Sequence, residues 1–280
     1  MSFESNDMKT NASPGSGIQT IPADQYHAMH EYLSNSLLSK FLESPAHLQS
    51  YLRARPAPTS AMELGSLIHT CILEPECLDR DYVVSPKFDK RTKDGKASAE
   101  AFAEANFGKK VIDEAAHTQI NGIIRSVFSH DAASAFLQKG VAEGSIFWTD
   151  EKTGVKCRAR IDYYRQDQGA LVDVKSTNDA RPREFQRSLI NFGYHRQLAF
   201  YDRALRSAGL PVERHIIVAV EKDDPYAVMV YELDPTALIM ANQEIDDALI
   251  RYAECLKTGV WPAYTQEIQF IGLPAWAMGA

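Results

Sequence analysis

Hydrophobic residues in this chain follow a helical spacing in the first half and near the end, and alternate with polar residues only in the middle. In the clearest helical repeat, within 60–75, apolar residues three and four positions apart share one face: Leu64, Leu67, Ile68, Cys71 and Ile72. The same spacing predicts further helices over 23–54, 100–107, 112–130, 131–138, 182–209 and 234–259.

Capping and breaking residues refine these helices. Ser36 is expected as the N-cap before Leu37, and Pro45 as the start of a second short helix. Gly193 interrupts the segment 182–209, and Pro235 falls in the first turn of the last helix. The charged segment 85–100 and the chain end from residue 260 are expected to be loops.

The middle of the chain predicts strands. Three lie within 144–177, separated by turns at 150–154 and 165–169, and two lie within 212–233 around a turn at 222–225. The order is helices, three strands, helix, two strands, helix. We therefore expect an α/β fold in which helices flank a central mixed sheet of about five strands. This single domain would span residues 25–280, after a flexible Ser-, Asn- and Gly-rich tail over residues 1–24.

Composition excludes several classes of protein. With 280 residues, 45% of them hydrophobic and 24% charged, the chain resembles an ordinary globular protein. Its longest apolar runs, such as 215–220, are too short to span a bilayer, and its N-terminus lacks the apolar stretch of a secretory signal. We expect a cytoplasmic protein with no membrane partner.

The four cysteines, Cys71, Cys77, Cys157 and Cys255, are irregularly spaced and form no CxxC pair. A disulfide framework or a zinc ribbon is therefore not expected. Because one iron–sulfur cluster needs four thiolates, such a cluster stays open at this point.

Charge is distributed unevenly. The net charge is −7, which argues against indiscriminate nucleic-acid binding, yet residues 152–206 hold 12 Lys and Arg against 6 Asp and Glu. A basic centre in an acidic chain fits a protein that binds a polyanion in one place; a solvated surface with clustered charges is the alternative.

Two aspartates and a lysine fall on predicted strands, where such residues are disfavoured. Alternation places Asp173 and Lys175 on one face of their strand, and Arg158, Arg160 and Asp162 on one face of the preceding strand. If the turn at 165–169 makes the strands antiparallel, Asp162 lies near Asp173. Two close carboxylates need a positive charge between them, which a divalent cation supplies, and a lysine beside them suits phosphodiester hydrolysis. A solvent-exposed hairpin remains the alternative.

Two further features have both a functional and a structural interpretation. His69 lies on a mainly apolar helix, four residues after Gly65. It is either a metal ligand or a histidine packed in the core. Gln197 and Tyr201, four residues apart, share one helical face, where they contact DNA or the site or simply form a surface pair.

The combined order is Gly-x-x-x-His, then Asp, then Asp-x-Lys, then Gln-x-x-x-Tyr. This order resembles the PD-(D/E)xK nuclease superfamily in its RecB-like branch, and in particular the RecE-type (exodeoxyribonuclease VIII-like) phage and prophage exonucleases. The resemblance covers roughly residues 25–260, including segments such as MELGSLIHTCILEP and ALVDVKSTNDARPREF. It implies a nuclease domain.

The resemblance also implies roles for individual residues. His69, Asp162, Asp173 and the Val174 backbone carbonyl would bind Mg²⁺, with Mn²⁺ as the alternative and two ions expected in the site. Lys175 would assist the attacking water, and Gln197 and Tyr201 would help to place DNA. Glu143, at the start of a strand leading into this region, is either a further acidic site residue or a structural one.

The implied reaction is processive 5′→3′ digestion of one strand of linear double-stranded DNA, leaving a 3′ overhang for a RecT-like single-strand annealing protein in recombination. Such enzymes form homo-oligomeric rings, trimers or tetramers. Arg158 and Arg160 are candidates for contacting the DNA backbone, and Ser36 is a further candidate for binding DNA. The basic segment with Lys90, Arg91, Lys93 and Lys96 either contacts DNA or is a solvated loop.

Other classes of function fit the sequence less well. A CRISPR-associated nuclease of the four-cysteine type would have three cysteines after the nuclease core, where this chain has only Cys255. An endonuclease and a non-catalytic DNA-binding phage protein stay open, although Asp162, Asp173 and Lys175 argue against the latter. A metabolic enzyme lacks support, because no GxGxxG, P-loop or GxSxG motif is present.

Overall fold

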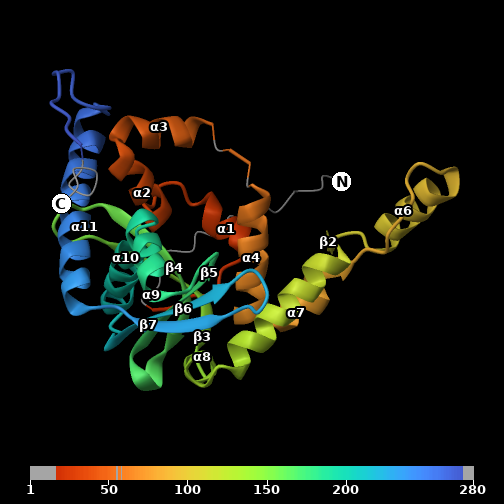
Figure 1. Ribbon diagram of the computed structural model, residues 1–280. Helices are drawn as coiled ribbons and strands as arrows, with labels where there is room; N and C mark the ends of the chain where they lie inside the picture. Colours follow the sequence, from red (N-terminus) through yellow and green to blue (C-terminus); the bar gives the residue numbers. More distant parts are fainter. Residues whose placement is uncertain (1–16, 55, 58, 274–280) are drawn as a thin grey trace, which may run out of the picture.

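The fold is built on a five-stranded mixed sheet with the strand order β3-β4-β5-β6-β7 (Figure 1). The computed structural model describes residues 17–54, 56–57 and 59–273. The strands of this sheet are β3 (Val141–Thr149), β4 (Lys156–Arg165), β5 (Ala170–Thr177), β6 (Arg214–Glu221) and β7 (Val228–Glu232). All neighbours are antiparallel except β5 and β6, which are parallel because two helices form the crossover between them. The predicted fold class is confirmed.

Helices flank both faces of this sheet (Figure 1). In chain order the helices are α1 (Ala23–Ala28), α2 (Asn35–Glu43), α3 (Pro45–Arg53), α4 (Ser60–Leu73), α5 (Glu76–Asp81), α6 (Lys93–Ala105), α7 (Glu114–Ser129), α8 (Asp131–Phe136), α9 (Pro182–Asn191), α10 (Tyr194–Ser207) and α11 (Pro235–Thr258). A short 3-10 turn, η1 (Gln166–Gln168), joins β4 to β5.

Two hydrophobic clusters hold these layers together. Helices α2, α10 and α11 pack in one cluster with Ile161, Leu171 and Ile217 of the sheet. Helices α4, α7 and α8 pack in the other with Val172 and Val174. Leu171 therefore lies on one face of β5, and Val172 and Val174 lie on the other, as the period-two alternation predicts. Among the described residues, no helix is both long and apolar enough to cross a membrane.

A projecting arm was only partly predicted. Helix α6 and the two-stranded parallel sheet of β1 (Tyr82–Val84) and β2 (Lys110–Ile112) extend away from the main sheet beyond α7 (Figure 1). The prediction of a loop over 85–100 was wrong from residue 93 onward, because the Thr92 hydroxyl accepts from the Gly95 N–H and caps α6. Strands β1 and β2 are too short to show alternation.

The N-terminal helices also differ from their prediction. Helix α1 ends at Ala28, and Leu33 then pairs with β4 through backbone bonds to Lys156 and Arg158 of 2.8 and 2.9 Å. This pairing leaves Ser34, not Ser36, at the N-cap of α2, where its hydroxyl accepts from the Leu37 N–H at 3.4 Å. Ser36 already lies in the first turn, and its hydroxyl contacts that of Ser34 at 2.9 Å.

The ends of the chain behave differently from each other. Residues 17–22, part of the expected tail, are bound to the domain: Gln19 and Ser145 exchange two backbone hydrogen bonds of 2.8 Å each. The rest of that tail, residues 1–16, lies outside the described residues. Residues 260–273 form neither helix nor strand, in agreement with the prediction of a loop.

The four cysteines lie on different elements, and all are buried free thiols. Burial raises the pKa of Cys71 to about 11 and that of Cys157 to about 12, so both are protonated at neutral pH. Among the described residues, the one group of three close metal-ligating side chains holds a single cysteine, Cys77, with Glu74 and Glu76. Cys157 and Cys255 pack in one hydrophobic cluster and Cys71 in another, so the four thiols are not gathered as an iron–sulfur cluster requires.

The position of the cap gives a direct test. Ser34→Ala is expected to lower the free energy of unfolding by about 1 kcal/mol, because it leaves a helix N–H without its acceptor. Ser36→Ala, the matched control two residues away, should cost clearly less. Urea denaturation followed by circular dichroism measures both; an equal or larger loss for Ser36→Ala would contradict the assignment of the cap.

Candidate active site

Asp162 occupies the point at which β4 and β5 separate. The two strands pair only from Tyr163 opposite Val172 to Arg165 opposite Ala170. Beyond this point the Val174 N–H of β5 no longer bonds to the backbone of β4. It donates a hydrogen bond of 2.8 Å to the side-chain Oδ2 of Asp162 instead. Asp162 is 5% exposed, so this bond fixes a carboxylate inside the sheet.

His69 reaches this carboxylate from helix α4. Its Nε2 lies 2.6 Å from Asp162 Oδ2, and its Nδ1 lies 3.2 Å from Glu143 Oε1. The helix that the apolar spacing predicted therefore brings His69 into the site, and the interpretation of His69 as an isolated core histidine is not supported. The imidazole ring lies between two acids, one on each nitrogen.

Glu143 is held in an unusual backbone conformation. Its φ of 50° is in the left-handed region, which is uncommon for residues other than glycine. The β3–β4 register passes from Ala142–Tyr163 to Gly144–Ile161 and omits the pair of Glu143 with Asp162. Both side chains of that omitted pair contact His69, so the irregular backbone accompanies the construction of the site.

Asp173 and Lys175 share one face of β5, as alternation predicts. Lys175 Nζ lies 2.6 Å from Asp173 Oδ2, and Asp173 is fully buried. Among the described residues, neither Asp173 oxygen accepts a hydrogen bond of normal geometry. A buried carboxylate with so few donors is costly unless a cation compensates it.

The pKa values of these groups diverge. Burial raises the pKa of Asp173 to about 7, against the attraction of Lys175. For Asp162, burial is outweighed by His69, Lys175 and the Val174 N–H, which lower the pKa to about 2. Burial opposes the charge of His69, but Asp162 and Glu143 raise its pKa to about 10. Carboxyl groups with such different pKa values in one place are typical of functional sites.

Helix α10 adds an amide and a phenol. Gln197 Nε2 donates to the Tyr201 oxygen at 3.0 Å, so the two side chains share a helical face as predicted. Burial and the nearby charges of Asp162 and Asp173 raise the pKa of Tyr201 well above its usual value. Tyr201 therefore belongs to the same site, and the alternative of a surface pair is wrong for this residue, which is 9% exposed.

The two arginines of β4 have internal partners. The guanidinium groups of Arg158 and Arg160 lie 4.6 and 4.5 Å from the centre of the Tyr26 ring. Arg158 is 3% exposed and donates to the Tyr26 carbonyl, while Arg160 donates to the Ile21 carbonyl at 2.5 Å. We therefore correct the expected DNA contact: Arg158 is buried under α1, and both side chains bind the N-terminal segment.

The other predicted DNA-binding residues are exposed. Arg91 pairs with Asp89, and Lys93 and Lys96 lie in the first turn of α6 on the arm (Figure 1). Ser36 is exposed on α2. The structure thus gathers His69, Asp162, Asp173, Lys175, Gln197, Tyr201 and Glu143, while Lys93 and Lys96 lie on the arm.

The gathered residues have the ligand types that a divalent cation needs, although among the described residues their ligand atoms do not already form a close cluster. The carboxylate oxygens of Asp162 and Asp173 and the Nε2 of His69 are ligand atoms of the kind that Mg²⁺ and Mn²⁺ accept. Apart from the ion pair with Lys175, the Asp173 oxygens accept no hydrogen bond of normal geometry among the described residues. Glu143 faces the opposite nitrogen of His69, where an acid orients a metal-binding imidazole. Val174 donates its N–H to Asp162; binding of a cation by its carbonyl stays a prediction.

Comparisons with known proteins agree with this fold. Residues 34–274 match the family described as a PDDEXK-like domain of unknown function (DUF3799). The structure of a candidate exonuclease from Eubacterium rectale is similar, with a TM-score of 0.62 at 15% identity, over 94% of this chain and 99% of that protein. No curated protein matches the chain.

Two other solved structures are more distant. A phage-related exonuclease from Haemophilus somnus 129PT has a TM-score of 0.36 at 14% identity, over 69% of this chain and 94% of its own. An alkaline exonuclease from Laribacter hongkongensis has a TM-score of 0.33 at 12% identity, over 85% and 97%. Nucleases with the PD-(D/E)xK fold generally use divalent metal ions.

The family match spans most of the chain and includes every residue gathered in the site. The expectation of a PD-(D/E)xK fold is confirmed, while the RecE-type branch stays a prediction. This chain belongs to the PDDEXK-like family DUF3799.

Proposed function

We propose that this protein is a metal-dependent exodeoxyribonuclease that hydrolyses linear double-stranded DNA. One observation carries the proposal: a buried Asp173 pairs with Lys175 beside the Asp162–His69 pair. This arrangement has the donors for a divalent cation and a lysine at the position where a phosphate would be attacked. The candidate exonuclease from Eubacterium rectale, which shares the fold, supports the choice of an exonuclease.

Each side chain of the site would have a separate role in hydrolysis. Bound Mg²⁺ or Mn²⁺, two ions being expected, would supply Lewis acidity at the phosphate. Burial opposes the charge of Lys175, but Asp173 and Asp162 raise its pKa, so the amine is a cation. It would hold the attacking water by donating a hydrogen bond and would offset the negative charge that develops on phosphate oxygens. Gln197 and Tyr201 would position the DNA strand.

Glu143 would act through His69. An acceptor at Nδ1 fixes which nitrogen carries the proton and leaves Nε2 to face the metal. Arg160 Nε, 4.0 Å from Glu143 Oε2, supports the carboxylate from the other side. We assign Glu143 as a positioning residue rather than a direct ligand.

The finer points of the proposal follow from the resemblance. They are 5′→3′ polarity, processive digestion, a 3′ overhang for a RecT-like annealing protein in recombination, assembly into a trimeric or tetrameric ring, and a cytoplasmic location in a bacterial host or phage-infected cell.

Hydrolysis and polarity can be tested together. Wild-type protein with Mg²⁺ or Mn²⁺ is expected to shorten linear duplexes and to leave closed circles intact, and release of a 5′ label before a 3′ label would establish 5′→3′ polarity. Lys175→Ala should reduce the rate by at least about 100-fold, because it removes the cation nearest the reacting phosphate. The matched control Lys152→Ala removes an exposed surface lysine and should keep full activity. Full activity of a folded Lys175→Ala variant would contradict the mechanism.

Metal binding can be tested without any activity. Mg²⁺ at one hundred times its dissociation constant should raise the free energy of unfolding of the wild type by about 2.7 kcal/mol. Asp173→Asn should abolish most of this gain, because it removes a ligand charge from a fully buried position. Asp167→Asn, in the exposed turn between the same strands, is the control and should keep the gain. Equal stabilisation of wild type and Asp173→Asn by Mg²⁺ would exclude this metal site.

Two substitutions of Glu143 distinguish a positioning residue from a direct metal ligand. If it orients His69, Glu143→Ala should weaken Mn²⁺ binding by about 10- to 100-fold, and Glu143→Gln, which keeps an acceptor for Nδ1–H, should restore part of the affinity. If it were a direct ligand, Gln would be nearly as damaging as Ala. Isothermal titration calorimetry with Mn²⁺ distinguishes the two.

A further inference from the structure

Four aromatic rings form a continuous stack next to the candidate active site. Tyr231 of β7 stacks on Phe185 of α9 with ring centres 4.9 Å apart and planes within 4°. Phe185 stacks on Tyr194 at 6.0 Å, and Tyr194 on Phe192 at 5.6 Å. The stack thus runs from Tyr231 on β7, through the buried Phe185 of α9 and Tyr194, to Phe192 at the C-terminal end of α9.

The stack reaches both the catalytic lysine and the solvent. Lys175 Nζ lies 5.0 Å from the centre of the Tyr194 ring, so Tyr194 contacts both the amine and Phe192. Phe192 is 66% exposed and its neighbour Ile190 is 70% exposed. An aromatic ring this exposed, stacked on one side, offers the remaining surface to another flat ring.

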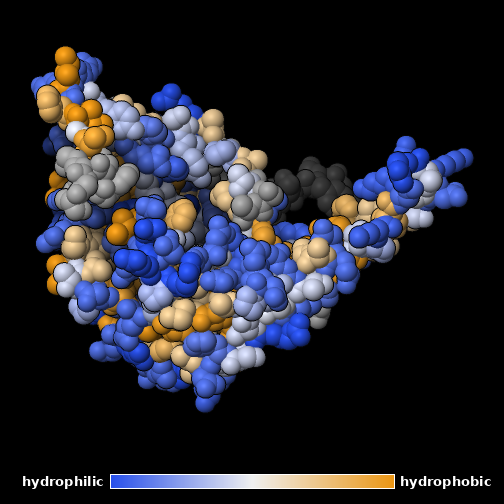
Figure 2. Space-filling model, viewed as in Figure 1, coloured by the Kyte–Doolittle hydropathy of each residue, from blue (hydrophilic) through white to orange (hydrophobic). Residues whose placement is uncertain are grey.

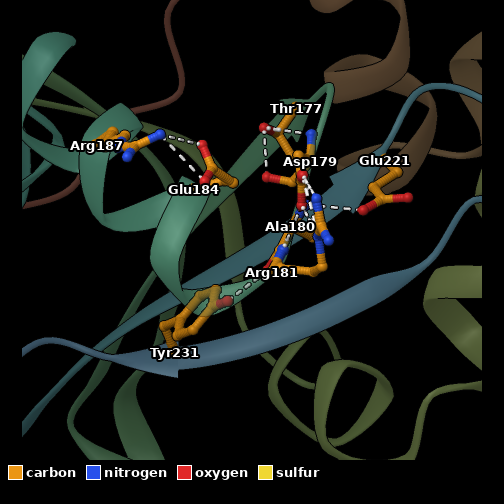
Figure 3. A network of polar contacts seen from close by, with 8 residues as sticks. All are labelled: Thr177, Asp179, Ala180, Arg181, Glu184, Arg187, Glu221 and Tyr231. Atoms are coloured by element: carbon orange, nitrogen blue, oxygen red, sulfur yellow. Dashed lines mark hydrogen bonds and ion pairs between the residues drawn. The ribbon is translucent and has the colours of Figure 1, made fainter.

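The base of the stack is held rigidly. Figure 3 shows the turn from β5 into α9, where the Tyr231 hydroxyl donates to the Ala180 carbonyl and the Ala180 N–H donates to Glu221 at 2.8 Å. Asp179 accepts from both the backbone and the guanidinium group of Arg181. These contacts fix the start of α9 on β6 and β7, so the rings that follow keep their orientation.

The surface beside Phe192 is basic. Arg183, Arg187 and Ile190 lie four and three residues apart on α9 and therefore share one stripe of the helix. Arg187 pairs with Glu184 at 2.8 Å, and both side chains are substantially exposed (Figure 3). Such a surface pair contributes little to stability, so its arginine is available to a phosphate. Figure 2 shows hydrophobic side chains next to strongly hydrophilic ones over the region of α9.

We propose that Phe192 is a stacking platform for an unpaired DNA base, with the arginine stripe of α9 contacting the adjoining phosphates. The proposal rests on the proposed function, since a nuclease of duplex ends must handle a strand with unpaired bases near the reacting phosphate. Aromatic rings beside arginines are how proteins bind single strands without sequence preference. A second copy of the chain could also cover Phe192, but the arginines next to it favour a polyanion.

The test uses two single-stranded 12-mers, one of thymidine nucleotides and one with four consecutive abasic sites, bound in the presence of Ca²⁺. Phe192→Ala should weaken binding of the thymidine 12-mer by about tenfold, the effect of losing one stacked base, and leave binding of the abasic 12-mer nearly unchanged. Phe192→Trp should keep or increase the affinity. Phe107→Ala removes an equally aromatic, 93% exposed residue from the arm and should change neither affinity.

Three outcomes would overturn the stacking platform. Equal losses for both 12-mers would show that Phe192 acts through structure, and a change in sedimentation of Phe192→Ala without DNA would identify a subunit interface. If wild type hydrolyses DNA but Phe192→Ala binds both 12-mers normally, the platform fails while the nuclease stands. If the wild type hydrolyses no DNA but Phe192→Ala still shows the base-dependent loss of affinity, the proposed function fails and the stacking platform stands.

Discussion

The hydrogen bond from the Val174 N–H to the Asp162 carboxylate determines how the site is built. Strands β4 and β5 stop pairing beyond Tyr163 and Val172, and a buried N–H that loses its sheet partner must find another acceptor. Asp162 is that acceptor, so the strands separate without an unsatisfied donor. The freed edge of β4 then pairs with Leu33, which brings the N-terminal helices onto the sheet.

The sequence predicts what depends on regular spacing. Alternation along one strand was enough to place Asp173 beside Lys175, and helical spacing was enough to pair Gln197 with Tyr201. Long-range contacts follow no such spacing. Nothing local indicates that Glu143 turns toward His69 through a left-handed backbone.

The predicted function of Arg158 and Arg160 failed for a related reason. Their face of β4 was predicted correctly, but spacing does not reveal that Tyr26 covers it. The basic character of residues 152–206 is reduced in the same way, because Arg203 and Lys152 both pair with Asp246 of α11. An acid from elsewhere in the chain thus offsets part of the positive charge of this segment, while Arg187 on α9 stays exposed.

The short bridge between Gln19 and Ser145 has a consequence for self-association. Strand β3 is an edge of the sheet, and an open edge is a template onto which a second chain can add a strand. The N-terminal segment occupies that template at Ser145, and Arg160 holds it there through the Ile21 carbonyl. While this segment is bound, a second copy of the chain cannot add a strand to the sheet at Ser145.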